Sequence, residues 1–206
     1  MLYIDADGYI DAARITKRIF PALHHGEMIH VNGIVVHQTN APTLQSTFNS
    51  YQHANANGAH FIIDKDGSIY QTASLFRITY HVGLMRSRCL ITHRCEPAEL
   101  KKAALLENAW RTKEISDREK AKTWPDRFPA NTDSIGIEIV GAAYKKDHSD
   151  KNAKEYIYEA VTEQQNQSLK WLISELKDTF GIRTNEIFRH PDIARKNETE
   201  ASSAKW

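Results

Sequence analysis

The chain has 206 residues, of which 41% are hydrophobic and 26% charged, and its formal net charge is +1. This length and composition fit one globular domain. A net charge so near zero excludes the strong basic field that holds nucleic acid, and no run of about 18 apolar residues predicts a transmembrane helix. We therefore expect a single domain over residues 1–206, with neither nucleic acid nor a membrane span involved.

The first 30 residues form a lead-in of mixed helical character, broken at Pro21. Acidic residues come first and no apolar stretch follows, so the sequence predicts no Sec signal peptide. Two locations stay open: the cytoplasm, or a compartment reached by a route that needs no such peptide.

Residues 33–83 carry alternating strand and helix signals. An uninterrupted apolar run within residues 33–40 predicts a short buried strand. Residues 41–56 predict a helix, because their apolar side chains recur at helical spacing. Two β-rich runs joined by a turn with a glycine predict a hairpin over residues 59–71, and residues 76–83 predict a further strand or extended segment.

Residues 84–133 interrupt this rhythm with polar and charged sequence. We interpret them as an inserted cap of helix and loop, with one helix over residues 97–122. Residues 134–141 then predict a strand with alternating isoleucines, and residues 162–181 an amphipathic helix with good cap residues at both ends. This order of elements predicts an α/β fold, a mixed central β-sheet flanked by helices, with an insertion subdomain.

The two cysteines, Cys89 and Cys95, lie close together inside the insertion. They are either free thiols in a reducing compartment or a local disulfide, which would indicate an oxidising one. A zinc site made of both cysteines and His93 is a weaker alternative, because it needs a fourth ligand and a more usual spacing.

Two of the ten histidines stand at the ends of predicted strands. His37 and His190 each follow a short apolar run, and a side chain there can project into a cleft, although a histidine in such a place is often only structural. Glu200 comes ten residues after His190. Two imidazoles and a carboxylate are a normal ligand set for catalytic zinc, with the fourth position left for water.

Glu138 is a carboxylate on a strand that otherwise has the pattern of a core strand. It is either a residue on the outward face of that strand or a general base that takes a proton from the attacking water.

Five segments in the order VVHQT, GAHFIIDKDGSIYQ, TYHVG, SIGIEIVG and RHPDIARKNETEA resemble the N-acetylmuramoyl-L-alanine amidase family. These zinc amidases are related to bacterial cell-wall recycling amidases, phage endolysins and peptidoglycan-recognition proteins. The resemblance covers about residues 33–83 and 134–206, and the aggregate of the segments carries it. It implies a mixed β-sheet flanked by helices, with zinc at one edge.

The resemblance also implies a ligand set. His37 and His190 match the two metal-binding histidines of the family. The third ligand is usually Asp or Cys, and the corresponding offset falls on Glu200, with Glu198 and Asp192 as fallback ligands.

Catalytic and substrate-binding roles follow in the same way. Glu138 matches the catalytic glutamate, and His81 matches a histidine that lines the substrate groove. Some members have a catalytic tyrosine where this chain has Ala59, and a lysine that stabilises the oxyanion where it has Glu198. Lys196 is the nearest substitute for that lysine.

The activity implied is zinc-dependent hydrolysis of the amide bond between N-acetylmuramic acid and L-Ala, with peptidoglycan or a muropeptide as substrate. The alternative is a peptidoglycan-binding module of the same fold that does not cut. Metal analysis would separate the two.

The cysteine loop and the helix after it resemble a branch of amidases found near bacterial type VI secretion systems. That branch implies an antibacterial effector that acts in the periplasm of a target cell and is matched by a cognate immunity protein. Such export would reconcile a disulfide with the missing Sec signal, while the cytoplasm stays the alternative.

Overall fold

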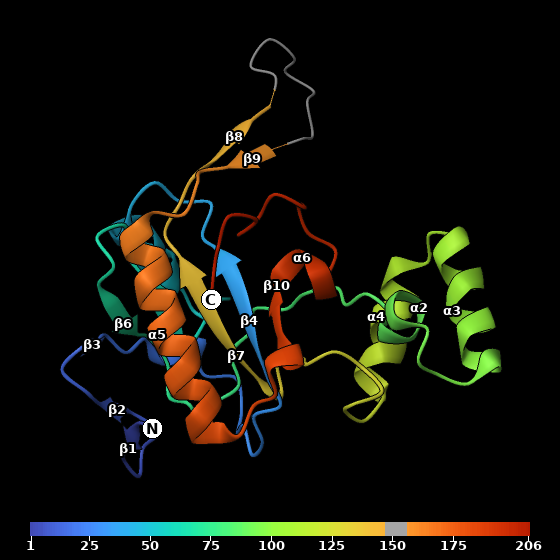
Figure 1. Ribbon diagram of the computed structural model, residues 1–206, viewed down its shortest axis with the longest axis horizontal. Coiled ribbons are helices and arrows are strands. Elements are labelled where there is room, and N and C mark those ends of the chain that lie inside the picture. The colour runs from blue at the N-terminus through green and yellow to red at the C-terminus, as the bar shows by residue number, and fades with distance from the viewer. Residues whose placement is uncertain (147–155) are drawn as a thin grey trace.

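The computed structural model, which describes residues 1–146 and 156–206, is built around a six-stranded mixed sheet (Figure 1). Its strands are β3 (Ile15–Lys17), β4 (Gly33–Gln38), β5 (Phe61–Ile63), β6 (Ile69–Gln71), β7 (Ser134–Ile139) and β10 (Ile187–Arg189). They lie in the order β10–β4–β7–β5–β6–β3. Only the β5–β6 pair is antiparallel among these neighbours, and it is the predicted hairpin.

One face of the sheet is covered by α5 (Glu163–Phe180), whose apolar side packs on alternate residues of the central strands. The helix begins at a capping box formed by Thr162 and Gln165 and ends at Gly181, where φ is 67°. The isoleucines of β7 at positions 135, 137 and 139 all lie in this core, as their alternation predicted. The predicted helix over residues 162–181 is confirmed.

The opposite face of the sheet is divided between two smaller clusters of apolar side chains. Under α1 (Leu44–Tyr51), Phe48 and Tyr51 pack with Ile62 of β5. Nearer β10, Val35 packs with Phe128 and with α6 (His190–Ile193). Between the two clusters, the carboxyl ends of β4 and β7 point polar side chains to this same face.

The lead-in differs from the predicted mixed helical character. Its short strands β1 (Tyr3–Ile4) and β2 (Ile10–Asp11) pair with each other, and β3 extends the main sheet. The only helical turn between residues 1 and 30 is η1 (Pro21–Leu23). Ile10 and Ile15 are buried in the main core, so tertiary packing decides the extended conformation here.

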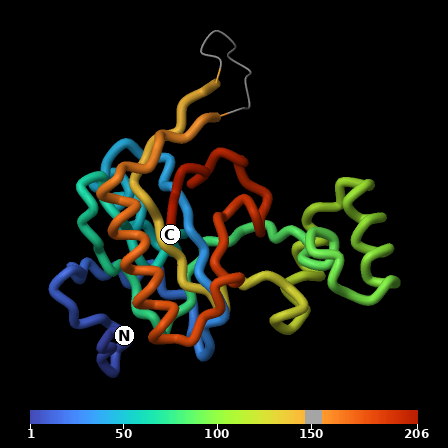
Figure 2. Tube along the Cα trace, in the orientation of Figure 1, coloured from blue at the N-terminus to red at the C-terminus, as the bar shows by residue number. Residues whose placement is uncertain are grey.

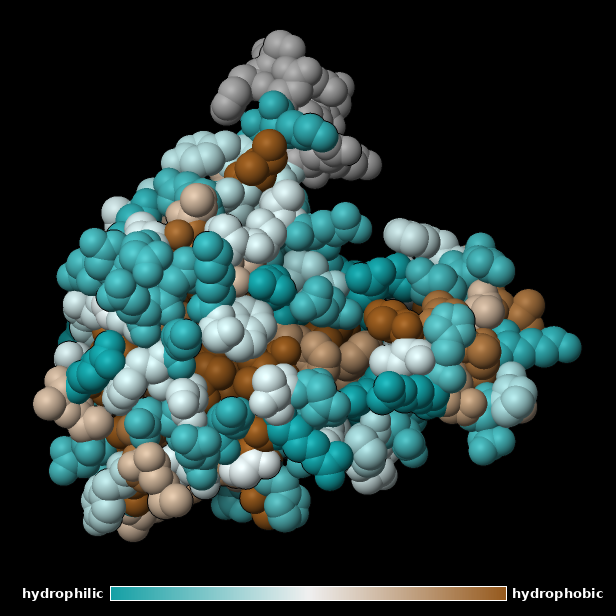
Figure 3. All heavy atoms as spheres, in the orientation of Figure 1, coloured by the Kyte–Doolittle hydropathy of each residue, from teal (hydrophilic) through white to brown (hydrophobic). Residues whose placement is uncertain are grey.

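The insertion carries three helices, α2 (Arg88–Thr92), α3 (Pro97–Asn108) and α4 (Thr112–Ala121), which form a lobe beside the sheet (Figures 1 and 2). The single helix predicted over residues 97–122 is wrong, because the chain turns at Trp110, where φ is 53°. The space-filling view shows the lobe standing out from the body, with mostly hydrophilic side chains on the visible face (Figure 3).

Buried polar contacts attach the lobe to the body. The guanidinium of Arg88 donates two hydrogen bonds, of 2.6 and 2.9 Å, to Glu186, which also accepts one from the Trp124 indole. Glu186 belongs to η2 (Thr184–Glu186), directly before β10, and is buried. Arg195, beyond α6, pairs with Glu107 of α3. The lobe is thus tied to the elements around β10.

Cys89 and Cys95 form a disulfide that ties α2 to the segment before α3. Of the two alternatives left open by the sequence, the structure has the bonded cysteines, and the zinc site with His93 is wrong. Residues 76–83, predicted as a strand or extended segment, form no strand and have one isolated bridge, at Arg77.

Two further strands, β8 (Ala143–Lys145) and β9 (Tyr156–Tyr158), pair antiparallel and project from the sheet (Figure 1). Within residues 1–146 and 156–206, no helix is both long and apolar enough to cross a membrane.

Candidate active site

The site begins with two side chains that the sheet places next to each other. His37 on β4 pairs in register with Glu138 on the parallel strand β7. Because neighbouring residues in register share a face of the sheet, both side chains project to the same side. Each is followed by the end of its strand, so the pair stands at the sheet edge where loops form a cleft.

His190 reaches the same place from the neighbouring strand. β10 pairs with β4 so that Arg189 lies beside Val36, and His190 is therefore level with His37. His190 is the first residue of the short helix α6, and Pro191 lies in the first turn of that helix. The rings of His37 and His190 lie 4.2 Å apart between centroids.

Glu200 completes the cluster from the segment after α6. This segment loops over the strand ends and returns to the sheet (Figures 1 and 2). Arg189 donates hydrogen bonds to the carbonyls of Ala201 and Ala204, and the amide of Ala201 donates to the Gln38 side chain at 3.2 Å. These bonds hold Glu200 with its side chain buried.

His37, His190 and Glu200 form one buried group whose donor atoms all lie within 4.8 Å of one another. Glu200 Oε1 is 2.9 Å from Nδ1 of His190 and 3.6 Å from Nδ1 of His37. Nε2 of His190 faces the carbonyl oxygen of Val82 at 2.8 Å, and a carbonyl can only accept. Nε2 of His190 therefore carries a proton, which leaves Nδ1 as the atom whose lone pair can face the carboxylate.

The electrostatics of the cluster fit a bound cation. Burial opposes ionisation of Glu200, but the adjacent imidazoles of His190 and His37 lower its pKa to about 2. Burial and the neighbouring His190 lower the pKa of His37 to about 4, so this ring is neutral at pH 7. An ionised carboxylate thus meets imidazole lone pairs in one buried place, and N and O donors in this number suit zinc with an open position.

Glu138 is half-buried beside this group and is not one of its members. Its Oε2 has no hydrogen-bond partner among the described residues. Burial, and then the charge of Glu200, raise the pKa of Glu138 to about 8. A buried carboxyl of this kind, aimed into a cleft and able to hold or release a proton near neutral pH, has the properties of a general base or acid.

These residues line a cleft of about 270 Å³, which also contains Lys196 and Tyr158. Lys196 reaches in from the segment after α6, and its positive charge favours the ionised form of Glu138. Burial, followed by the charges of Glu200 and Glu138, raises the pKa of Tyr158, which keeps its hydroxyl protonated. The same cleft is therefore lined by a lysine side chain, a tyrosine hydroxyl and two carboxyl groups.

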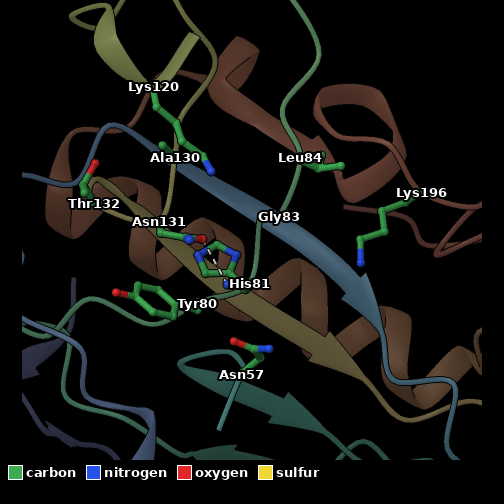
Figure 4. Close-up of a pocket in the computed structure, with 10 residues that line it drawn as sticks. All are labelled: Asn57, Tyr80, His81, Gly83, Leu84, Lys120, Ala130, Asn131, Thr132 and Lys196. Carbon is green, nitrogen blue, oxygen red and sulfur yellow. Dashed lines mark hydrogen bonds between the residues drawn. The ribbon is translucent and has the colours of Figure 1, made fainter. Parts of the chain in front are cut away.

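A second cavity of about 640 Å³ continues from the first toward the insertion (Figure 4). Asn57, Tyr80, His81 and Lys196 line both. Lys120 of α4 enters the larger cavity from the insertion, opposite Lys196 (Figure 4). The insertion thus forms one wall of a groove that leads to the candidate centre.

The structure brings together His37, His190, Glu200, Glu138 and Lys196, all of which the sequence singled out. It leaves the fallback ligands aside: Glu198 is exposed, and Asp192 is exposed and accepts a hydrogen bond from the Arg189 amide at 3.0 Å. Ala59, where some amidases have a tyrosine, is buried.

His81, predicted to line a substrate groove, lines both cavities, and its ring is buried against His37. Nδ1 of His81 is 3.0 Å from Nε2 of His37.

Sequence reasoning missed Tyr158, Asn57 and Tyr80. Tyr158 lies on β9, outside every predicted element, and nothing in its local sequence ties it to the strand ends of the main sheet. Tyr80 stacks on His25 with ring centroids 3.8 Å apart and stands directly before His81. Its place in the extended run 76–83 was the one signal that would have drawn attention to it.

A family model described as N-acetylmuramoyl-L-alanine amidase matches residues 27–202. Among curated proteins, no sequence matches the chain.

Solved structures share the fold at low sequence identity. A selenomethionine derivative of AmpD has a TM-score of 0.58 and 18% identity, covering 100% of this chain and 96% of that one. AmpDh3 from Pseudomonas aeruginosa in complex with anhydromuramic pentapeptide has a TM-score of 0.52 and 19% identity, covering 96% of this chain and 61% of that one. The endolysin LysCS from Clostridium intestinale has a TM-score of 0.50 and 17% identity, covering 91% of this chain and 87% of that one. The predicted fold class, a mixed central sheet flanked by helices, is confirmed.

Proposed function

The chain belongs to the N-acetylmuramoyl-L-alanine amidase family, and from this premise we propose that it hydrolyses the bond between N-acetylmuramic acid and L-Ala of peptidoglycan in a zinc-dependent reaction. Membership of the family confirms the predicted enzyme class. The observation that carries the mechanism is the carboxyl group of Glu138, whose Oε2 is buried without a partner among the described residues, in the same cleft as His37, His190 and Glu200.

His37, His190 and Glu200 are the residues that would hold zinc. Their fit rests on the donor set itself: two imidazole lone pairs and an ionised carboxylate converge in a buried place, and such an arrangement is stabilised by a cation. Zinc bound there would polarise a carbonyl and bring the pKa of water toward about 7.

Glu138 is the general base in this proposal. It accepts the proton of the attacking water as the oxygen adds to the scissile carbonyl carbon. It then delivers a proton to the amide nitrogen as the C–N bond breaks. The products are a carboxylate on the lactyl group and the free amino terminus of L-Ala, so the water is fully accounted for. A pKa of about 8 lets one carboxyl perform both transfers near neutral pH.

In this proposal Lys196 and Tyr158 stabilise the negative charge that develops on the carbonyl oxygen. Both line the cleft of the candidate centre. The lysine offers a charge and the protonated tyrosine a hydrogen bond, and donors of this kind act strongly where water is excluded.

Release of free stem peptide from purified peptidoglycan tests the proposal, with wild type, Glu138→Gln and His37→Ala compared at equal zinc. We expect Glu138→Gln to lose about 10²–10⁴-fold in rate, the usual contribution of a general base, while it retains zinc. His37→Ala should lose both metal and activity. If wild type with bound zinc releases no stem peptide from any peptidoglycan type but still sediments with it, the protein is the binding module of the same fold.

We propose further that the protein is one catalytic domain whose insertion, residues 84–133, selects the stem peptide. Lys120 and Lys196 flank the larger cavity from opposite sides (Figure 4). A stem peptide carries free carboxylates. The ammonium groups of Lys120 and Lys196 beside the larger cavity would favour binding of such an anionic peptide.

The location we propose is the periplasm of a target cell, reached by type VI secretion, with a cognate immunity protein in the producer. The disulfide between Cys89 and Cys95 supports it, because disulfides persist in oxidising compartments. An immunity protein would inhibit the enzyme by covering the groove between sheet and insertion. The cytoplasm is the alternative location.

A further inference from the structure

We propose that His81 is a positioning residue for the metal centre: it fixes the proton and the ring plane of His37, and with Val82 it forms the outer support of both histidine ligands. This inference rests on the proposed zinc site. Its starting point is a chain of hydrogen bonds that runs from His37 through His81 to Ser134.

Ser134, at the far end of this series of hydrogen bonds, decides which ring nitrogens of His81 and His37 carry a proton. Nε2 of His81 lies 3.3 Å from both the carbonyl oxygen and the hydroxyl oxygen of Ser134. The carbonyl can only accept, and the Ser134 hydroxyl already donates to the carbonyl of Ala130 at 2.6 Å. Nε2 of His81 must therefore carry the proton, which leaves its Nδ1 as an acceptor.

The tautomer of His37, at the near end, follows from that of His81. Nδ1 of His81 is 3.0 Å from Nε2 of His37, so His37 donates its Nε2 proton to His81. The lone pair of His37 is then on Nδ1, the atom that faces Glu200. A metal-bound histidine typically donates its outer N–H to a partner that fixes tautomer and ring orientation. His81 is that partner for His37.

His190 has the same support from the adjacent residue. Its Nε2 faces the carbonyl oxygen of Val82. Two consecutive residues, one through its side chain and one through its backbone, thus hold the outer nitrogens of both histidines. A shift of this dipeptide would turn both rings at once.

The dipeptide is itself held firmly. The backbone amides of His81 and Val82 both donate to the Asn131 side chain, at 3.0 and 2.8 Å. Figure 4 shows Asn131 beside His81. The ring of His81 lies on Gly136 of β7, where an added Cβ would come within 3.0 Å of its Cγ and Nδ1. Asn131 lies near the end of the insertion, residues 84–133. Its side chain therefore connects the wall of the groove to His81 and Val82, which support the two histidine ligands.

The test is zinc affinity, measured by competition with a chelator, for wild type, His81→Ala and His53→Ala. We expect His81→Ala to bind zinc about 10–100-fold more weakly, the usual effect of losing such a partner. His53→Ala, the same change at an exposed histidine outside both cavities, should bind as wild type does. Equal affinities for wild type and His81→Ala would overturn the proposal while the zinc enzyme stands.

A measurement on the unaltered protein covers the case in which His81→Ala does not fold. Nitrogen NMR of histidine-labelled, metal-free protein near pH 7 should show His37 protonated on Nε2 and His81 on Nε2. A proton on Nδ1 of His37 would overturn the proposal. If wild type binds no zinc at all, the proposed function fails together with this inference.

Discussion

The surroundings of Glu138 disfavour the ionised form of its carboxyl group. Burial, and then the charge of Glu200, raise its pKa from 4.5 to about 8. A group with a raised folded pKa stabilises the fold fully below its unfolded pKa, and this stabilisation is lost as pH rises to the folded value. The metal-free native state should therefore lose stability between about pH 4.5 and 8 on account of this one carboxyl.

Glu138→Gln should remove this pH-dependent loss of stability, because an amide does not ionise. Measured by chemical denaturation with a chelator present, the variant should gain on wild type progressively from pH 5 to pH 8. One pKa unit corresponds to about 1.4 kcal/mol, so the gain at pH 8 should be a few kcal/mol at most. A difference that stays constant over this range would show that the carboxyl ionises alike in the folded and unfolded chain.

The residues of the site could largely be named from the sequence, but their orientation could not. His37 and His190 follow apolar strands, and strand ends at one edge of a sheet meet. The proton positions depend on the backbone carbonyls of Val82 and Ser134, and a carbonyl is common to every residue. No sequence pattern therefore marks which one faces an imidazole.

The helix α4 offers a clear contrast between its two lysines. Lys120 lines the larger cavity, whereas Lys113 pairs with Asp117 at 2.6 Å on the exposed surface.

We expect Lys120→Ala to raise KM for a stem-peptide substrate about fivefold with little change in kcat, because an exposed charge pair contributes up to about 1 kcal/mol. Lys113→Ala is the matched control and should leave both constants unchanged. An equal effect of the two variants on KM would contradict a role for the insertion in the groove.

Elements whose periodicity agrees with their packing were the predictable ones. The helix α5 and the strands β4 and β7 follow their apolar patterns because each buries the face that the pattern marks. The split between α3 and α4 had no such signal, since Trp110 is neither glycine nor asparagine and yet takes a positive φ. The lead-in strands depend on a sheet edge supplied by distant residues.

The whole protein combines a peptidoglycan amidase fold with a disulfide in its insertion. Closing so short a loop contributes about 2 kcal/mol by restricting the unfolded chain. Reduction should therefore loosen the wall of the groove first.

Directed to the periplasm of a test bacterium, the protein should lyse cells, whereas cytoplasmic expression should not, because substrate and oxidant are outside. The Glu138→Ala variant should be harmless in both places, and the Cys89→Ser/Cys95→Ser variant should lyse more slowly. Culture density over time gives the readout. Equal lysis from both compartments would contradict the proposed location.

The position of β4 between β7 and β10 has a consequence for how activity arises. β4 comes early in the chain, and both of its neighbours come much later. Pairings between such distant segments form slowly, because a long loop must close before any contact is gained. A folding intermediate that lacks β10 also lacks His190 and Glu200 at the cleft. Hydrolytic activity should thus appear only with the completed sheet, so a partly folded chain is harmless to the cell that makes it.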